Sequence, residues 1–240
     1  MKTLRGSHPV FHNIDWRLDG SSEDPTSPLL LALHGMGMDE DVFARLLTPL
    51  LNMPISFLIP RGLYPMEIRG EGGEGRIGAS WYAYDGDQDR FRLELLRTES
   101  HLLALLASVE HGQRLKPRKR YLLGFSQGGY CGAFIALRHP EIFSGMIICG
   151  ARVKWEFLHD EMKIAGALGF RALLCHGARD PAVSIDAAER SYHELTQNGV
   201  DTRLIKTDTG HSFGRTQTSE IRTWLESAAF GASEREWPHR

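Results

Sequence analysis

Short apolar runs of strand length alternate along this chain with longer segments in which apolar residues recur at helical spacing. The runs that predict strands are 29–33, 55–59, 121–124, 146–149, 172–175 and 202–205. The segments that predict helices are 39–51, 90–110, 127–138, 185–198 and 216–229. This alternation is typical of an α/β fold with a mostly parallel central sheet and helices on both faces. Strands buried on both faces are nearly all apolar, as 29–33 and 172–175 are.

Four segments lie outside the alternation. Residues 10–18 alternate between apolar and polar, which favours an antiparallel edge strand. The connections 61–89 and 152–170 are long and irregular, and long connections in compact domains are usually functional or mobile. We expect both to help cover a site, although the sequence assigns no role to the glycine-rich run 70–78 in the first of them. Residues 231–240 read as a polar tail.

Composition limits the class of protein. The 240 residues, 42% of them hydrophobic, predict one α/β domain with its core at about 28–229. A net charge of −2 gives no bulk electrostatic reason to expect a nucleic-acid partner, and the basic stretch 114–120 favours a solvated loop over a binding patch. No apolar run approaches the roughly 18 residues of a membrane span, and the N-terminus lacks the apolar segment of a signal peptide. We therefore expect a soluble, unprocessed protein.

The three cysteines indicate the compartment. Cys131, Cys149 and Cys175 lie in apolar surroundings without paired spacing, so they read as reduced core residues, and a cytosolic setting follows. No HExxH motif or Cys/His ligand cluster suggests a metal, and the GEGGEG run lacks the Lys-Ser/Thr ending of a phosphate loop. We expect no cofactor.

A G-x-S-x-G sequence stands where a predicted strand meets a predicted helix, at Gly124-Phe125-Ser126-Gln127-Gly128. In a nucleophile elbow the turn is so tight that the serine takes a strained conformation, and the flanking glycines remove side chains that would collide. The alternative, an ordinary glycine-rich turn, is weakened because a strand and a helix flank the motif in the required places. Ser126 is therefore the predicted nucleophile.

A serine hydroxyl needs a base and an orienting carboxylate, which follow it in this architecture in the order acid, then histidine. Asp180 follows the predicted strand 172–175, and His211 follows the strand 202–205. Both would lie at carboxyl ends of parallel strands, where open α/β sheets place their sites. Singly, each is as well explained as a turn aspartate or a surface histidine; their order favours catalysis. The competing acids are Asp186, Asp201 and Asp208, and His34 and His176 read as structural.

Catalysis of acyl transfer also needs an oxyanion hole. The backbone N–H of Gln127, directly after the nucleophile, is one predicted donor, and that of Met36 in the His34-Gly35-Met36-Gly37 turn is the other. Trp81, Tyr82 and the segment from Trp155 to Met162 are predicted to line the substrate pocket. The alternative, that these aromatics anchor loops, stays open.

With these motifs the sequence resembles the α/β-hydrolase superfamily, and within it the phospholipase/carboxylesterase group that includes acyl-protein thioesterases. The resemblance spans about 28–229 and is carried by Leu33-His34-Gly35-Met36-Gly37, Gly124-Phe125-Ser126-Gln127-Gly128-Gly129, His176-Gly177-Ala178-Arg179-Asp180-Pro181 and Gly210-His211-Ser212. It implies a minimal cap and serine-dependent cleavage of carboxylic esters or thioesters, with Ser126, Asp180 and His211 at the triad positions. Three departures concern the substrate: Trp81-Tyr82 is followed by Ala83 rather than an acid, the preceding glycine-rich insertion is unlike the usual members, and Ala182-Val183-Ser184 lacks a second proline.

The predicted function is therefore hydrolysis of a small-molecule acyl ester or thioester through an acyl-enzyme. A peptidase of the same fold is one alternative, and a slow-turnover ligand-binding protein that keeps the triad is another. The sequence leaves the natural substrate, the acyl chain length and the oligomeric state open.

Overall fold

The computed structural model describes residues 13–20, 22–69 and 75–231. Its main sheet has seven strands in the order β1-β3-β2-β6-β7-β8-β9. These are β1 (Trp16–Gly20), β2 (Leu29–Leu33), β3 (Ser56–Pro60), β6 (Arg120–Phe125), β7 (Gly145–Cys149), β8 (Arg171–Gly177) and β9 (Asp201–Thr207). Every neighbouring pair is parallel except β1 and β3. The prediction of a mostly parallel sheet with an antiparallel edge strand is confirmed, although β1 extends to Gly20 and residues 10–12 of the predicted strand lie outside the described residues.

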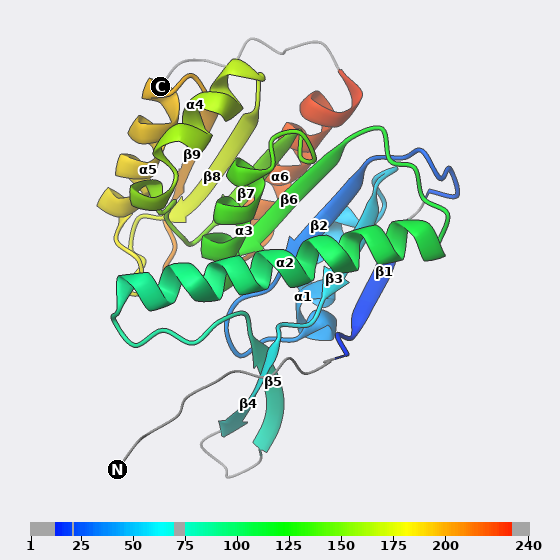
Figure 1. Cartoon of the computed structure of the whole chain (residues 1–240), viewed down its shortest axis with the longest axis horizontal. Helices are drawn as coiled ribbons and strands as arrows, with labels where there is room; N and C mark the ends of the chain where they lie inside the picture. The colour runs from blue at the N-terminus through cyan, green and yellow to red at the C-terminus, as the bar shows by residue number, and fades with distance from the viewer. Residues whose placement is uncertain (1–12, 21, 70–74, 232–240) are drawn as a thin grey trace, which may run out of the picture.

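Helices cover both faces of this sheet (Figure 1). They are α1 (Glu40–Leu47), α2 (Gln88–Gly112), α3 (Gln127–Arg138), α4 (His159–Ala167), α5 (Ile185–Gln197) and α6 (Arg215–Phe230), with short 3-10 turns η1 (Thr48–Leu50) and η2 (Trp155–Phe157). Residues of α2, α3, α4 and α5 share one buried cluster with the sheet, and residues of α1 and α6 share the other. The sheet is thus buried from both sides, as its apolar strands require.

Two predicted helix boundaries change for local reasons. The helix predicted at 90–110 begins at Gln88, because the Asp87 carboxylate accepts a hydrogen bond from the Arg90 N–H at 3.0 Å and caps the first turn. The helix predicted at 39–51 ends at Leu47 and continues only as a 3-10 turn, because Pro49 has no N–H to offer the α-helical ladder.

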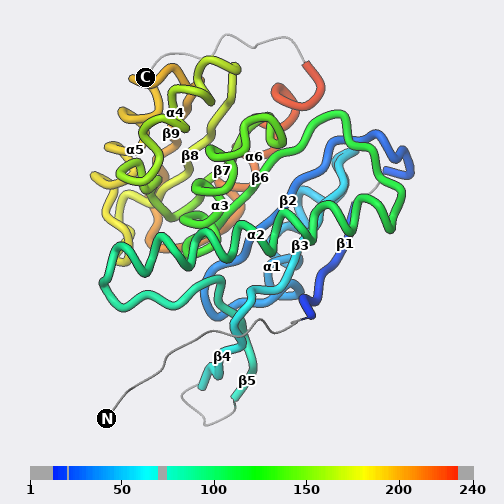
Figure 2. The backbone as a smooth tube through the Cα atoms, viewed as in Figure 1, coloured from blue at the N-terminus to red at the C-terminus, as the bar shows by residue number. Residues whose placement is uncertain are grey.

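The connection 61–89 holds a two-stranded antiparallel sheet that the sequence did not predict. Strands β4 (Tyr64–Arg69) and β5 (Gly75–Ser80) pair from Tyr64 with Ser80 to Arg69 with Gly75. Figure 2 shows this hairpin extending from the body of the molecule. Its outer part is exposed, so its glycines and charged residues give no apolar pattern, whereas the last three residues of β5 are buried.

The buried end of β5 joins the turn that follows β2. The Gly37 N–H donates to the Ala79 carbonyl, and the Ala79 N–H donates to the Met38 carbonyl, both at 2.8 Å. A Cβ on Gly78 would lie 2.7 Å from the carbonyl carbon of Gly37 and closer still to its oxygen, so only glycine fits against this turn. The hairpin is therefore a structural neighbour of the predicted oxyanion turn.

Other predictions from composition can be compared with the described residues. All three cysteines are free and buried. In the basic stretch, Arg118 pairs with Asp24 and Arg120 with Glu110, which fits a solvated loop. Among the described helices, none is long and apolar enough to cross a membrane. Within the same residues there is no group of three or more potential metal-ligating side chains.

Candidate active site

The junction between β6 and α3 has the geometry of a nucleophile elbow. Ser126 has φ 53° and ψ −120°, a conformation that non-glycine residues rarely adopt. A Cβ on Gly124 would lie 2.6 Å from the carbonyl carbon of Gly128, and a Cβ on Gly128 would lie 2.6 Å from that of Leu33. The strand, the turn and the helix therefore approach each other at distances that only glycine permits, and the Ser126 side chain stands at the carboxyl end of β6.

The structure brings the three predicted triad side chains together in one hydrogen-bonded chain. His211 Nε2 lies 2.8 Å from Ser126 Oγ, and His211 Nδ1 lies 2.7 Å from Asp180 Oδ2. The neutral ring can satisfy both contacts only as the tautomer that donates from Nδ1 to the carboxylate and accepts the serine proton at Nε2. Asp180 follows β8 and His211 follows β9, so parallel strands deliver all three residues to one edge of the sheet.

Asp180 lies in a turn that fits an ionised carboxylate. Its side chain is fully buried, and its Oδ1 accepts hydrogen bonds from the backbone N–H groups of Ala182 at 2.8 Å and Val183 at 2.9 Å. Burial raises the pKa of Asp180, but the Val183 N–H, His211 and the Ala182 N–H outweigh it and hold the pKa below its ordinary value. The buried His176 closes the same turn through a 2.8 Å contact from Nε2 to the Val183 carbonyl.

The His211 ring is held by aromatic packing as well. Phe125, the residue before the nucleophile, stacks on it with the ring centroids 5.2 Å apart and an interplanar angle of 29°. On the same side, a Cβ on Gly150 would lie 3.3 Å from His211 Cε1. The imidazole therefore has little room to rotate away from Ser126.

The predicted oxyanion turn lies against the nucleophile. A Cβ on Gly35 would be 3.4 Å from Ser126 Cβ, and Met36 and Gln127 line the same cleft as Ser126. Gln127 is the first residue of α3, where a backbone N–H has no helical acceptor. The turn after β2 and the start of α3 thus both lie next to Ser126.

The Gln127 side chain has a role that the sequence did not reveal. Its Oε1 accepts from the Trp81 N–H at 2.9 Å, and its Nε2 donates to the Tyr82 carbonyl at 2.9 Å. Both amide atoms also contact the Ser80 hydroxyl. This buried amide ties the chain after β5 to the helix that begins at the nucleophile.

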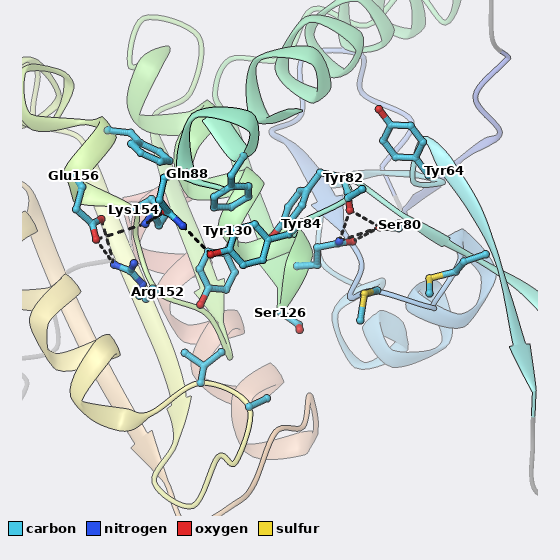
Figure 3. A pocket seen from close by; sticks show the side chains of 18 of the residues that line it. Tyr64, Ser80, Tyr82, Tyr84, Gln88, Ser126, Tyr130, Arg152, Lys154 and Glu156 are labelled. Carbon is cyan, nitrogen blue, oxygen red and sulfur yellow. Dashed lines mark hydrogen bonds and ion pairs between the residues drawn. The ribbon is translucent and has the colours of Figure 1, made fainter. Parts of the chain in front are cut away.

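A cleft of about 1350 Å³ opens beside Ser126. Figure 3 shows the serine between two unlike sides of it. The hairpin and the turn after β2 supply mostly apolar residues on one side, namely Met36, Tyr64, Pro65 and Met66. The chain after β7 supplies Arg152, Lys154, Glu156 and Phe157 on the other. Both irregular connections therefore border the cleft, as the sequence predicted.

The predicted pocket residues lie in different places. Tyr82 lines the cleft, but Trp81 does not: it is fully buried, and its indole N–H donates to the His34 carbonyl at 2.8 Å. His34 itself accepts from the Gly62 N–H at 2.9 Å, and burial lowers its pKa to about 4, so this histidine is a neutral core residue. Trp81 therefore supports the wall from behind, because its hydrogen-bond partner lies in the core.

Trp155, the second tryptophan predicted to line the pocket, also lies outside the described cleft lining. Trp155 packs under the Arg152 guanidinium, 4.8 Å from the ring centroid, and is absent from the described cleft lining, where its neighbours Glu156 and Phe157 stand. Sequence reasoning missed Tyr130, Arg152 and Lys154. Tyr130 carried a usable signal, since it lies one helical turn after Ser126 and so shares its face of α3.

Comparison with known proteins agrees with this architecture. The phospholipase/carboxylesterase family model matches residues 20–229. A probable carboxylesterase SOBER1-like protein of Arabidopsis thaliana is 27% identical over 143 residues, which are 54% of this chain and 52% of the relative. This chain thus spans about half the length of that curated relative.

Two solved structures show the same fold. A Bacillus cereus carboxylesterase superposes with a TM-score of 0.72 at 16% identity, covering 90% of this chain and 94% of the other. The Zea mays acyl-protein thioesterase 2 gives a TM-score of 0.70 at 18% identity, covering 91% and 100%. Because the family model matches most of this chain, the chain belongs to the phospholipase/carboxylesterase family and has its α/β-hydrolase fold.

Proposed function

We propose that this protein is a serine hydrolase that cleaves carboxylic esters or thioesters through an acyl-enzyme. The observation that carries the proposal is the chain of hydrogen bonds from Ser126 Oγ through His211 to the buried Asp180, at 2.8 Å and 2.7 Å. Membership of the phospholipase/carboxylesterase family supports the substrate class. The free cysteines are compatible with a cytosolic setting, which stays a prediction.

In the proposed mechanism Ser126 Oγ attacks the acyl carbonyl carbon while His211 Nε2 takes the hydroxyl proton. Asp180 accepts the Nδ1–H, which fixes the tautomer and stabilises the imidazolium that forms. The backbone N–H groups of Met36 and Gln127 are the proposed donors to the oxyanion, and in other hydrolases removal of such a donor costs about 2.7–4 kcal/mol.

Collapse of the tetrahedral intermediate breaks the bond to the leaving oxygen or sulfur, which receives the proton from His211. Water then enters, loses a proton to His211 Nε2 and attacks the acyl carbon. The second collapse releases the carboxylic acid, and the proton returns to Ser126 Oγ. Two half-reactions therefore share one base, and the low pKa of Asp180 keeps the orienting carboxylate charged through both.

The test is hydrolysis of short-chain p-nitrophenyl esters by the wild type, Ser126→Ala and the control Ser219→Ala. Ser219 is an exposed residue of α6. We expect turnover by the wild type and the control, and loss of activity in Ser126→Ala. A fluorophosphonate probe should also add to Ser126, as mass spectrometry of the labelled peptide would show. Equal turnover by Ser126→Ala and wild type would refute the proposal.

A panel of acyl chain lengths, presented as paired esters and thioesters, would then narrow the substrate. Peptide amides belong in the same panel, because peptidase activity is the alternative within this fold. Binding of a panel compound without turnover by the wild type would favour the slow-turnover alternative.

A further inference from the structure

The two sides of the cleft differ in charge, and the side formed by the chain after β7 is its charged end. Among the described residues that line it, Arg152, Lys154 and Glu156 are the charged ones, and all three come from the chain after β7. Arg152 Nη1 contacts Glu156 Oε1 at 3.0 Å and Oε2 at 3.2 Å, and Lys154 Nζ lies 3.5 Å from Glu156 Oε1. Two cations therefore share a single carboxylate, which leaves one positive charge at this end.

Lys154 is shielded from bulk water, as a group that binds a charged ligand should be. It is 7% exposed, and its ammonium donates to Gln88 Oε1 at 2.8 Å and lies 4.8 Å from the centre of the Phe157 ring. An amide oxygen and a ring face attract the cation without neutralising it. Desolvation, and secondarily the charge of Arg152, lower the pKa of Lys154, and the opposing contribution of Glu156 does not outweigh them.

The charged end is continuous with Ser126. Figure 3 shows Tyr130 between Ser126 and the Arg152 side chain, and all three line the same cleft. A ligand whose reacting carbonyl lies at Ser126 can therefore extend over Tyr130 to the cations. A guanidinium matches the oxygens of a carboxylate or phosphate in two parallel hydrogen bonds, and an adjacent ammonium adds a point charge.

We infer that the substrate carries an anionic group, a carboxylate or a phosphate, on the part that lies over Tyr130, and that Arg152 and Lys154 bind this group. The inference rests on the proposed function, since it names the substrate class of the same site. The apolar side formed by Met36, Tyr64 and Met66 then takes the other part of the ester.

A purely structural role for the ion network makes a different prediction. If Arg152, Lys154 and Glu156 only tie down the chain after β7, loss of any member loosens the cleft wall and harms neutral and anionic substrates alike. If the network binds an anion, removal of a cation and removal of the carboxylate act in opposite directions. The sign of the effect therefore separates the two roles.

The experiment compares kcat/KM for matched substrates. Mono-4-nitrophenyl adipate against 4-nitrophenyl heptanoate places the charge on the acyl group, and 3-carboxy-4-nitrophenyl butyrate against 4-nitrophenyl butyrate places it on the leaving group. The anionic-to-neutral ratio is measured for the wild type, Lys154→Met, Glu156→Gln and the control Lys163→Met. Comparing one pair across variants cancels the intrinsic reactivity of the two esters. Lys163 is an exposed residue of α4, outside the cleft lining.

In at least one of the two substrate pairs, which we call arms, we expect Lys154→Met to lower the anionic-to-neutral ratio of kcat/KM about tenfold, which is the effect of losing one charge-assisted hydrogen bond. We expect Glu156→Gln to raise the same ratio. Lys163→Met should keep the wild-type ratio. Unchanged ratios in both arms, or a lowered ratio in both Lys154→Met and Glu156→Gln, would overturn the inference. Turnover of the neutral esters would still support the proposed function in that case. Should Lys154→Met fail to fold, the sign for Glu156→Gln decides, because that side chain is 41% exposed and tolerates replacement. Failure of the proposed function is distinguishable, because Ser126→Ala would then hydrolyse both members of a pair at the wild-type rate.

Discussion

Replacement of Gly78 by alanine tests whether the hairpin positions the turn after β2, which holds the proposed oxyanion donor Met36. The added Cβ would lie 2.7 Å from the Gly37 carbonyl carbon and 3.0 Å from its Cα, with the carbonyl oxygen nearer still. These are backbone atoms, so no side chain can rotate away to relieve the contact. Gly75, at the other end of β5, is a matched control, because a Cβ there meets nothing closer than 3.7 Å. Neither glycine has a positive φ, so steric contact alone separates them.

The magnitude follows from the displacement that relieves this contact. Ordinary separation of non-bonded carbons is about 3.5–4.0 Å, so β5 and the turn must part by about 1 Å. Because Gly37 and Met38 are hydrogen-bonded to Ala79, the turn cannot stay in place while the strand moves. Loss of one oxyanion donor lowers kcat by about 10²–10³, and overpacking costs roughly 1–3 kcal/mol of stability.

The assay is kcat for a p-nitrophenyl ester, with urea unfolding of each variant to show that it is folded. We expect Gly78→Ala to lose at least about a hundredfold in kcat relative to Gly75→Ala, which should match the wild type. A folded Gly78→Ala protein with kcat within about twofold of the control would refute the reasoning, because the turn would then tolerate the displacement without loss of an oxyanion donor.

Three further predictions concern the buried polar groups. Asp180→Asn should lower kcat about 10⁴-fold because the amide favours the wrong His211 tautomer, whereas Asp208→Asn should not; a loss below tenfold would contradict this. Gln127→Leu should lower the free energy of unfolding by about 2 kcal/mol, because it strands buried backbone groups, and urea unfolding should show no such loss in the exposed Gln197→Leu. The lowered pKa of His34, about 4 against an ordinary 6.5, means that the unfolded state binds more protons between these values, so stability decreases as the pH is lowered through this range. His34 should contribute about 2 kcal/mol of the loss between pH 7 and pH 5, and an equal loss in His34→Gln would argue against it.

The positions of Ser126, Asp180 and His211 after β6, β8 and β9 could be predicted from the sequence because the constraints there are local, whereas their catalytic roles belong to the proposed function. A tight strand-to-helix turn demands glycines around Ser126. The carboxyl ends of parallel strands share one edge, so an acid and then a histidine that follow two later strands indicate Asp180 and His211. The apolar runs likewise identify strands that are buried on both faces.

The cleft lining and the hairpin were not predicted correctly, because contacts between distant segments determine which side chains are buried there. Trp81 and Tyr82 are neighbours in sequence, but only Tyr82 reaches the cleft. Gln127 holds the Trp81 N–H and the Tyr82 carbonyl, and the Trp81 indole donates to the carbonyl of the buried His34. Lys154 is buried by contacts with Gln88 of α2 and Phe157 of η2, which are distant or irregular segments that no local pattern brings together. The hairpin is mostly exposed, so it carries no apolar pattern to detect.

In the turn after Asp180, the backbone and the side chains of the same residues have different roles. Ala182 and Val183 present their backbone N–H groups to the carboxylate and also border the cleft. A side-chain change at either position can reshape the space available to a substrate, while any residue except proline still supplies the donor. Substrate preference can therefore diverge at this turn without disturbing the charge on which the base depends, which makes it a natural starting point for altering specificity by design.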